Sequence, residues 1–132
     1  MYASKITFFT ILLFMAFHAD AQGKFSGSEM LRNCEQSERI LATPRGVPSN
    51  ADNLMASLCL GFMVGLEHGV MVGESASGIS NDNAIFCIPQ QANNEQRLRV
   101  ILLYLRSHPE RLHEYAAPLF ARAYEEAFPC RK

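Results

Sequence analysis

Four cysteines, Cys34, Cys59, Cys87 and Cys130, constrain the fold of this 132-residue chain more than any other feature. The oxidation state of these cysteines depends on the compartment in which the protein folds, because thiols stay reduced in the cytosol and are oxidised outside it. A zinc site is disfavoured, since the chain has no Cys-x-x-Cys pair and the cysteines lie far apart in sequence. The even count therefore predicts two disulfides if the chain is exported.

The N-terminal segment has the parts of a secretory signal peptide. Lys5 supplies a positive charge, Ile6 to Phe17 contain no charged residue, and Ala19-Asp20-Ala21 offers the small-x-small pattern at which signal peptidase cuts. The alternative is a membrane anchor, but the apolar run is shorter than the roughly 20 residues that span a bilayer. We therefore predict cleavage after Ala21, export, and a mature chain of residues 22–132 that does not contact the membrane.

The charge balance of the chain argues against nucleic acid as a partner. The chain holds 12 Lys and Arg against 13 Asp and Glu, with a net charge of −1 and both signs scattered along the sequence. Such a chain has no basic face for nucleic acid. Residues 22–132 are enough for one small domain, whose modest core would gain from covalent cross-links.

Capping residues and apolar spacing predict an all-α fold, a small helical domain of about four to five helices with two disulfides. Ser26 and Glu29 form a capping box that begins a helix, and this helix ends near Leu41, before the proline- and glycine-rich segment 43–50. Asn93 is the N-cap of another helix. No hairpin or strand pattern is present in the sequence.

Two prolines divide the C-terminal helical region. The helix that follows Asn93 should end before His108, because Pro109 disfavours helical geometry in the residue that precedes it. A last helix then follows, with Pro118 inside it. Since proline lacks the amide that continues the helical hydrogen bonds, we expect a kink or a split at Pro118.

The segment from Asp52 to Gly73 is the most hydrophobic part of the mature chain and is apolar on nearly all sides of a helix. This composition predicts a central helix. Its glycines, Gly61, Gly65, Gly69 and Gly73, recur every four residues and form a stripe where another backbone can approach closely. We expect this stripe to pack in the core of the domain; a contact between two copies of the chain is the alternative.

Residues 74–86 are rich in Ser, Asn, Asp and Gly and are predicted to form a long loop. A loop of this length either has a function or serves as a tether.

The sequence contains no recognisable catalytic motif. No nucleophile elbow, phosphate-binding loop, dinucleotide fingerprint or haem-attachment site is present. His108 and His113 have the wrong spacing for a zinc-binding helix pair. Glu67 and His68 are adjacent, so they point in different directions on a helix, and we interpret Glu67 as a structural group with a partner. We expect no enzyme activity, no catalytic residue, no cofactor and no metal.

The cysteines and their neighbours nevertheless form a pattern. It comprises Leu31-Arg-Asn-Cys34, Cys59-Leu-Gly61 with Gly65, Phe86-Cys87-Ile-Pro89, Gln96, Tyr104-Leu105, His108-Pro109-Glu110 and Phe128-Pro129-Cys130. In this order the pattern resembles the Tai/Rap family of immunity proteins for amidase effectors of type VI secretion. The resemblance covers nearly the whole mature chain.

The resemblance implies a periplasmic protein that binds a cognate peptidoglycan amidase effector and inhibits it sterically. It also implies a small helical homodimer that presents a loop to the substrate cleft of the effector. We assign this role to the loop predicted above, with partner-binding residues Ser75, Ser77, Gly78, Ile79, Ser80, Asn81, Asp82 and Asn83. Alternatives are a periplasmic stress chaperone, which would need charge asymmetry or exposed apolar surface, and an orphan binding domain of the same family.

Four cysteines allow three disulfide connectivities. We expect Cys34–Cys130 and Cys59–Cys87, because this arrangement nests one covalent loop inside the other and ties both ends of the mature chain to the core.

Overall fold

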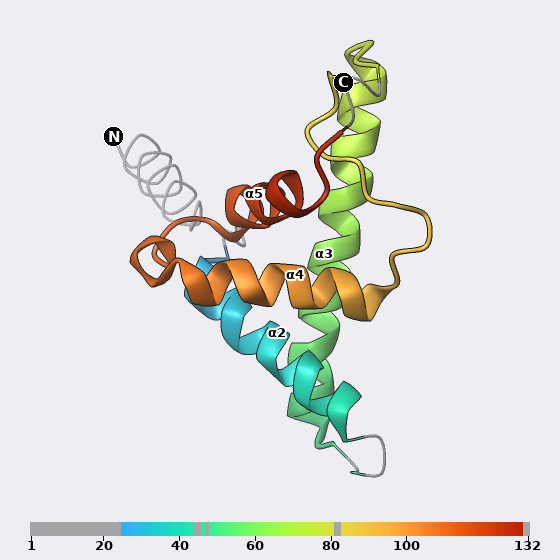
Figure 1. The fold of residues 1–132 in the computed structure, drawn as a ribbon. Coiled ribbons are helices and arrows are strands. Elements are labelled where there is room, and N and C mark those ends of the chain that lie inside the picture. Colours follow the sequence, from blue (N-terminus) through green and yellow to red (C-terminus); the bar gives the residue numbers. More distant parts are fainter. Residues whose placement is uncertain (1–24, 44–45, 47, 81–82, 131–132) are drawn as a thin grey trace, which may run out of the picture.

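The computed structural model describes residues 25–43, 46, 48–80 and 83–130, and this part of the chain is all-α. Its helices are α2 (Gly27–Ala42), α3 (Asn50–Ala76), α4 (Asn94–Ser107), the 3-10 helix η2 (Pro109–Arg111) and α5 (Ala116–Ala127) (Figure 1). The predicted fold class is confirmed. The predicted signal peptide, residues 1–21, lies outside the described residues.

Side-chain caps set the starts of three helices. At the start of α2, Ser26 Oγ accepts a hydrogen bond from the amide of Glu29, while the Glu29 carboxylate accepts one from the amide of Ser26. The same reciprocal pair begins α3, with Ser49 as the N-cap and Asp52 three residues later. Asn93 Oδ1 accepts from the third amide of α4 at 2.9 Å. The predicted caps at Ser26 and Asn93 are therefore confirmed.

The break in the C-terminal region lies before Pro118. The chain leaves α4 at His108, makes the short helix η2, and begins α5 only at Ala116. Pro118 is thus in the first turn of α5, where backbone amides have no partner within the helix, so its missing amide costs no helical hydrogen bond. No kink is needed there, because the split occurs in the residues before the proline.

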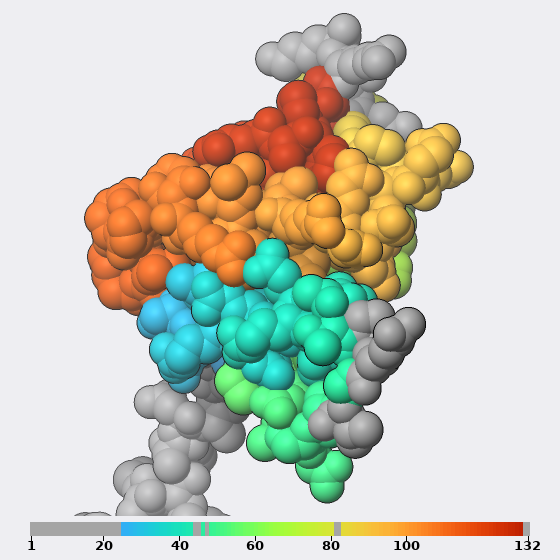
Figure 2. Space-filling view, turned by 60° about the horizontal axis from the view of Figure 1, so that its bottom comes forward, coloured from blue at the N-terminus to red at the C-terminus, as the bar shows by residue number. Residues whose placement is uncertain are grey.

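The hydrophobic core lies between α2, α4, α5 and one side of α3, which contributes Cys59 and Met63. On the face shown in Figure 2, α4 lies between α5 and α2, and the N-terminal part of α3 is visible at the edge beyond α2. The helix α4 contributes the apolar face that its sequence predicts, with Leu98, Ile101, Leu102 and Leu105 at most 1% exposed. Tyr124 and Phe120 of α5 and Met30 of α2 complete the same core with no exposed surface.

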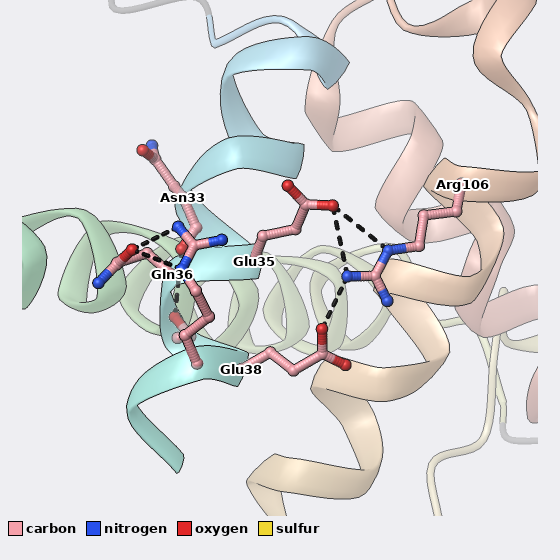
Figure 3. Close-up of polar contacts among 7 residues, drawn as sticks. Asn33, Glu35, Gln36, Glu38 and Arg106 are labelled. Atoms are coloured by element: carbon pink, nitrogen blue, oxygen red, sulfur yellow. Dashed lines mark hydrogen bonds and ion pairs between the residues drawn. The ribbon is translucent and has the colours of Figure 1, made fainter. Parts of the chain in front are cut away.

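An ion-pair cluster fastens α4 to α2 at the surface. The Arg106 guanidinium of α4 donates to Glu38 at 2.7 Å and to Glu35 at 3.3 Å (Figure 3). The hydrogen bond from Arg106 holds the pKa of the Glu38 carboxyl below its usual range. Because these side chains are 33% to 44% exposed, the pairs contribute about 1 kcal/mol or less each to stability.

The predicted disulfide pairing is wrong. The structure joins Cys34 to Cys59 and Cys87 to Cys130, with Cα–Cα distances of 5.1 and 4.9 Å. The helices α2 and α3 lie side by side, and this places Cys34 opposite Cys59 in the core. The segment after α5 returns to the segment after α3, where the amide of Cys87 donates to the carbonyl of Phe128 at 2.8 Å. Packing of neighbouring elements therefore decided the pairing, rather than a closure of the chain ends.

The predicted central position of α3 is also wrong. Only Ala56, Cys59 and Met63 of its 27 residues are buried. A methyl group built at Gly61, Gly65, Gly69 or Gly73 would meet no atom within 4 Å, so the glycine stripe faces open space and does not pack in the core. Among the described helices, α3 has the length and apolar composition of a helix that could cross a membrane, which core helices of soluble proteins also can have.

Candidate partner-binding site

The predicted partner-binding residues lie at the C-terminal end of α3, which continues into the predicted loop as far as Ala76. Ser75 belongs to the last turn of this helix, and the chain leaves the helix at Ser77. Asn81 and Asp82 lie outside the described residues. The residues from Ser77 to Ala84 connect α3 to the segment that contains Cys87, and we call them the presented loop.

A glycine cap ends α3 and sets the direction of the presented loop. The amide of Ile79 donates to the carbonyl of Glu74 at 2.9 Å, and the amide of Gly78 donates to the carbonyl of Ser75 at 3.2 Å. Gly78 has φ of 67°, a left-handed conformation that this type of cap requires. The sequence signal was available, because a glycine directly after a helical segment is the usual mark of such a cap.

The other end of the presented loop is held by three contacts. The amide of Ile85 donates to Glu74 Oε1 at 2.7 Å, so that the two ends of the loop meet at one glutamate. Phe86 packs edge-to-face on Tyr124, with ring centroids 5.3 Å apart. Cys87 is joined to Cys130. A loop fixed at both ends loses less entropy on binding than a free one.

The described residues of the presented loop expose mostly small polar groups and one large apolar side chain. Ser77, Gly78, Ser80 and Asn83 are exposed, and Ile79 is 43% exposed. An exposed isoleucine on a loop that is fixed at both ends can insert into an apolar pocket on another protein. The exposed polar groups around Ile79 can form hydrogen bonds, so this end of the molecule is suited to binding another protein.

A hollow of about 590 Å³ lies beside the presented loop, between the C-terminal half of α3 and the segment that leads to α4. Its lining mixes apolar side chains, among them Val70, Met71, Phe86 and Ile88, with the charged side chains of Glu67, Glu74 and Arg97. Sequence patterns do not predict this hollow, because its walls come from segments that only the tertiary fold brings together.

Glu67 ties the three helices behind the hollow. Its carboxylate accepts from Arg97 of α4 and from the hydroxyl of Tyr124 of α5 at 2.7 Å. Burial of Tyr124, followed by its bond to Glu67, raises the pKa of the tyrosine hydroxyl. The interpretation of Glu67 as a structural group with a partner is confirmed, and His68 does not share that role because it is exposed.

A family of known proteins matches most of this chain. The description of the matching family is Rap1a immunity proteins, and the match covers residues 26–130. Searches of the curated proteins and of the solved structures give no match. The matched region contains α2 to α5, both disulfides and the presented loop. The chain therefore belongs to the Rap1a immunity protein family, and membership implies that it binds a cognate effector.

Proposed function

We propose that this protein is a periplasmic immunity protein that binds a peptidoglycan amidase effector of type VI secretion and inhibits it sterically, without catalysis of its own. Family membership supports a role against an effector. The signal-like residues 1–21 support action outside the cytoplasm, which is where a peptidoglycan amidase meets its substrate.

The observation that carries the inhibitory mechanism is the geometry of the presented loop. Glu74 and the Cys87–Cys130 disulfide fix its base, while Ile79 is exposed beyond the end of α3. In the proposed complex the loop enters the substrate cleft of the amidase, Ile79 fills an apolar subsite, and the polar residues around it pair with the rim. Substrate is then excluded by volume alone.

The first experiment measures binding to a purified amidase, chosen as a small secreted cysteine–histidine hydrolase whose gene neighbours this one. Ile79→Asp should weaken binding in calorimetry by about a hundredfold or more, since a carboxylate would be buried in an apolar subsite. Leu103→Asp is the matched control: Leu103 is 70% exposed on α4, so its replacement should leave affinity unchanged. Equal affinities for both variants would contradict the assignment of the loop.

We also propose that the functional unit is a homodimer, as the family resemblance implies. A stress chaperone remains the alternative of a different class, and the exposed apolar residues of α3 are the observation that favours it. Pull-down from a periplasmic extract separates the two functions. An immunity protein captures one amidase in stoichiometric amount, whereas a chaperone captures many unfolded proteins.

A further inference from the structure

The hollow beside the presented loop combines an apolar lining with charged groups. Its volume of about 590 Å³ is within the range of roughly 300 to 1,000 Å³ that is common for binding pockets. Much of the apolar lining comes from Val70, Met71, Phe86 and Ile88. An aliphatic chain that enters the hollow therefore leaves water for apolar contacts, which is favourable.

Two of the charged lining residues neutralise each other. Glu67 Oε2 is paired with the guanidinium of Arg97, and Glu67 Oε1 accepts a hydrogen bond from the hydroxyl of Tyr124. The Arg97 guanidinium also donates to the side chain of Asn94 at 2.8 Å. The Glu67–Arg97 pair therefore adds no net charge to the hollow, and both oxygens of Glu67 already have partners.

Glu74 is the charged lining residue that has no counter-charge in the described part of the chain. Its Oε1 accepts a hydrogen bond from the amide of Ile85 at 2.7 Å, and this bond holds the carboxylate in one position. Its Oε2 accepts no hydrogen bond from the described residues. This oxygen is accessible to solvent, because every buried polar side-chain atom of the described residues has a partner. The hollow thus offers one fixed, negatively charged acceptor.

A basic side chain matches both features of the hollow. Lysine and arginine each carry an aliphatic stem with a cationic group at its end. The stem can lie on the apolar lining while the cationic group donates to Glu74 Oε2, and the ring of Phe86 in the same lining adds an attraction for a cation. An acidic side chain is repelled by Glu74. An apolar one leaves the carboxylate without water and without a partner, which is costly.

The position of the hollow favours a side chain of a protein over a free cation. Met71 is 58% exposed, and His68 and Gln90 in the lining are exposed too, so a small free cation would stay largely hydrated. The segment that follows the presented loop, yellow in Figure 1, runs beside the end of α3 that carries the loop. A protein bound to the loop therefore lies beside the hollow, and its side chains are present there at a high effective concentration.

We propose that the hollow receives a lysine or arginine side chain of the effector, with the cationic group bound to Glu74. This inference rests on the proposed function and adds a second contact next to the presented loop. It makes Glu74 a residue that determines specificity, because effectors without a basic side chain at this point leave its charge unpaired.

Calorimetry with the same purified amidase tests the role of Glu74. Glu74→Gln removes the charge but keeps an oxygen that can accept from the amide of Ile85, so the base of the loop should stay in place. We expect this variant to bind the amidase about tenfold more weakly or worse. Glu125→Gln is the matched control, because it removes the same charge from an exposed ion pair on α5 and should bind as the wild type does.

The outcomes separate this inference from the proposed function. If Glu74→Gln binds as tightly as the wild type, the inference is overturned and the role of the presented loop is unaffected. If the wild type does not bind the amidase, both are overturned. Circular dichroism and thermal melting show whether each variant is folded.

A second pair of variants tests the hollow itself. Met71→Lys places a cation on α3 three residues before Glu74, where it competes for the carboxylate, and should weaken binding by about tenfold. Met71→Leu keeps the apolar lining and should bind as the wild type does.

A double-mutant cycle then identifies the side chain that enters the hollow. The surface lysines and arginines of the amidase are replaced one at a time by methionine, and each variant is measured against the wild type and against Glu74→Gln. One replacement should cost about tenfold or more in affinity for the wild type and much less for Glu74→Gln. If every replacement costs the same with both forms, no basic side chain pairs with Glu74 and the inference is overturned.

Discussion

Glu67 is the residue on which several parts of the fold depend. Its side chain is 10% exposed, and it accepts hydrogen bonds from Arg97 and from Tyr124, so one carboxylate joins α3, α4 and α5. These three elements come from distant parts of the sequence, and the carboxylate that joins them lines the hollow beside the presented loop. A charge so well enclosed costs desolvation, and its partners must both be in place to compensate for it.

We predict that Glu67→Gln lowers the free energy of unfolding by about 2 kcal/mol, because the Arg97 guanidinium loses its counter-charge in a partly buried site. Glu125→Gln is the control: Glu125 pairs with Arg122, but both side chains are about half exposed, so the change should be within about 0.5 kcal/mol. Urea denaturation measures both. Similar losses for the two variants would show that Glu67 is no more than a surface charge.

At the scale of the element, α3 is the unusual part of the molecule. It begins with a reciprocal cap at Ser49 and ends with a glycine cap at Gly78, so both of its ends are well defined. One side of it is attached to the rest of the chain by its buried residues, by the Cys34–Cys59 disulfide and by the hydrogen bonds of Glu67. The helix thus acts as a support that carries the presented loop at one end, while its glycine stripe is exposed along one side.

Two glycines of this region should respond to alanine in opposite directions. Gly78→Ala should destabilise the protein by about 1 kcal/mol, since a left-handed conformation is unfavourable for a residue with a side chain. Gly73→Ala should be neutral or stabilise the protein by up to about 1 kcal/mol, because Gly73 is helical and exposed to open space. Thermal denaturation of the two variants shows whether each one is less or more stable than the wild type. Destabilisation by Gly73→Ala would contradict the open space around this position.

At the scale of the whole molecule, the two disulfides connect the fold to the compartment in which the protein is proposed to act. The two disulfides close separate parts of the chain: Cys34–Cys59 joins the first two described helices, and Cys87–Cys130 fixes the base of the presented loop. Both require an oxidising compartment. Export is therefore part of the proposed function, because the protein must acquire its disulfides and meet its effector on the same side of the membrane.

Removal of residues 1–21 should leave binding of the amidase unchanged but abolish protection of the cell. The mature chain, refolded under oxidising conditions, should bind the amidase in calorimetry as tightly as the exported protein does. Cells that make only this shortened chain in the cytosol should be lysed when the amidase is directed to their periplasm, whereas cells with the full chain should survive. Survival of both would contradict the periplasmic site of action.

Much of this protein could be predicted from local sequence. Helix caps such as Ser26 and Asn93, and the apolar face that begins at Leu98, depend on residues within one or two turns of each other, so the sequence determines them directly. The all-α class and the presence of two disulfides follow from the same kind of local or compositional evidence. Short segments around the cysteines also carry the resemblance to an immunity family, and the match confirms membership of the Rap1a immunity proteins.

The tertiary structure determines the features that depend on residues far apart in the sequence, namely the disulfide partners and the burial of α3. A cysteine spacing cannot show which helices are neighbours, so the partners of Cys34 and Cys87 follow only from the way the helices and the C-terminal segment pack. The apolar composition of α3 predicted that this helix is buried, but the described part of the chain covers only one side of it. The amino-acid composition indicates how much apolar surface the protein must bury. Whether the same chain or a second molecule covers that surface depends on the arrangement of the helices in space.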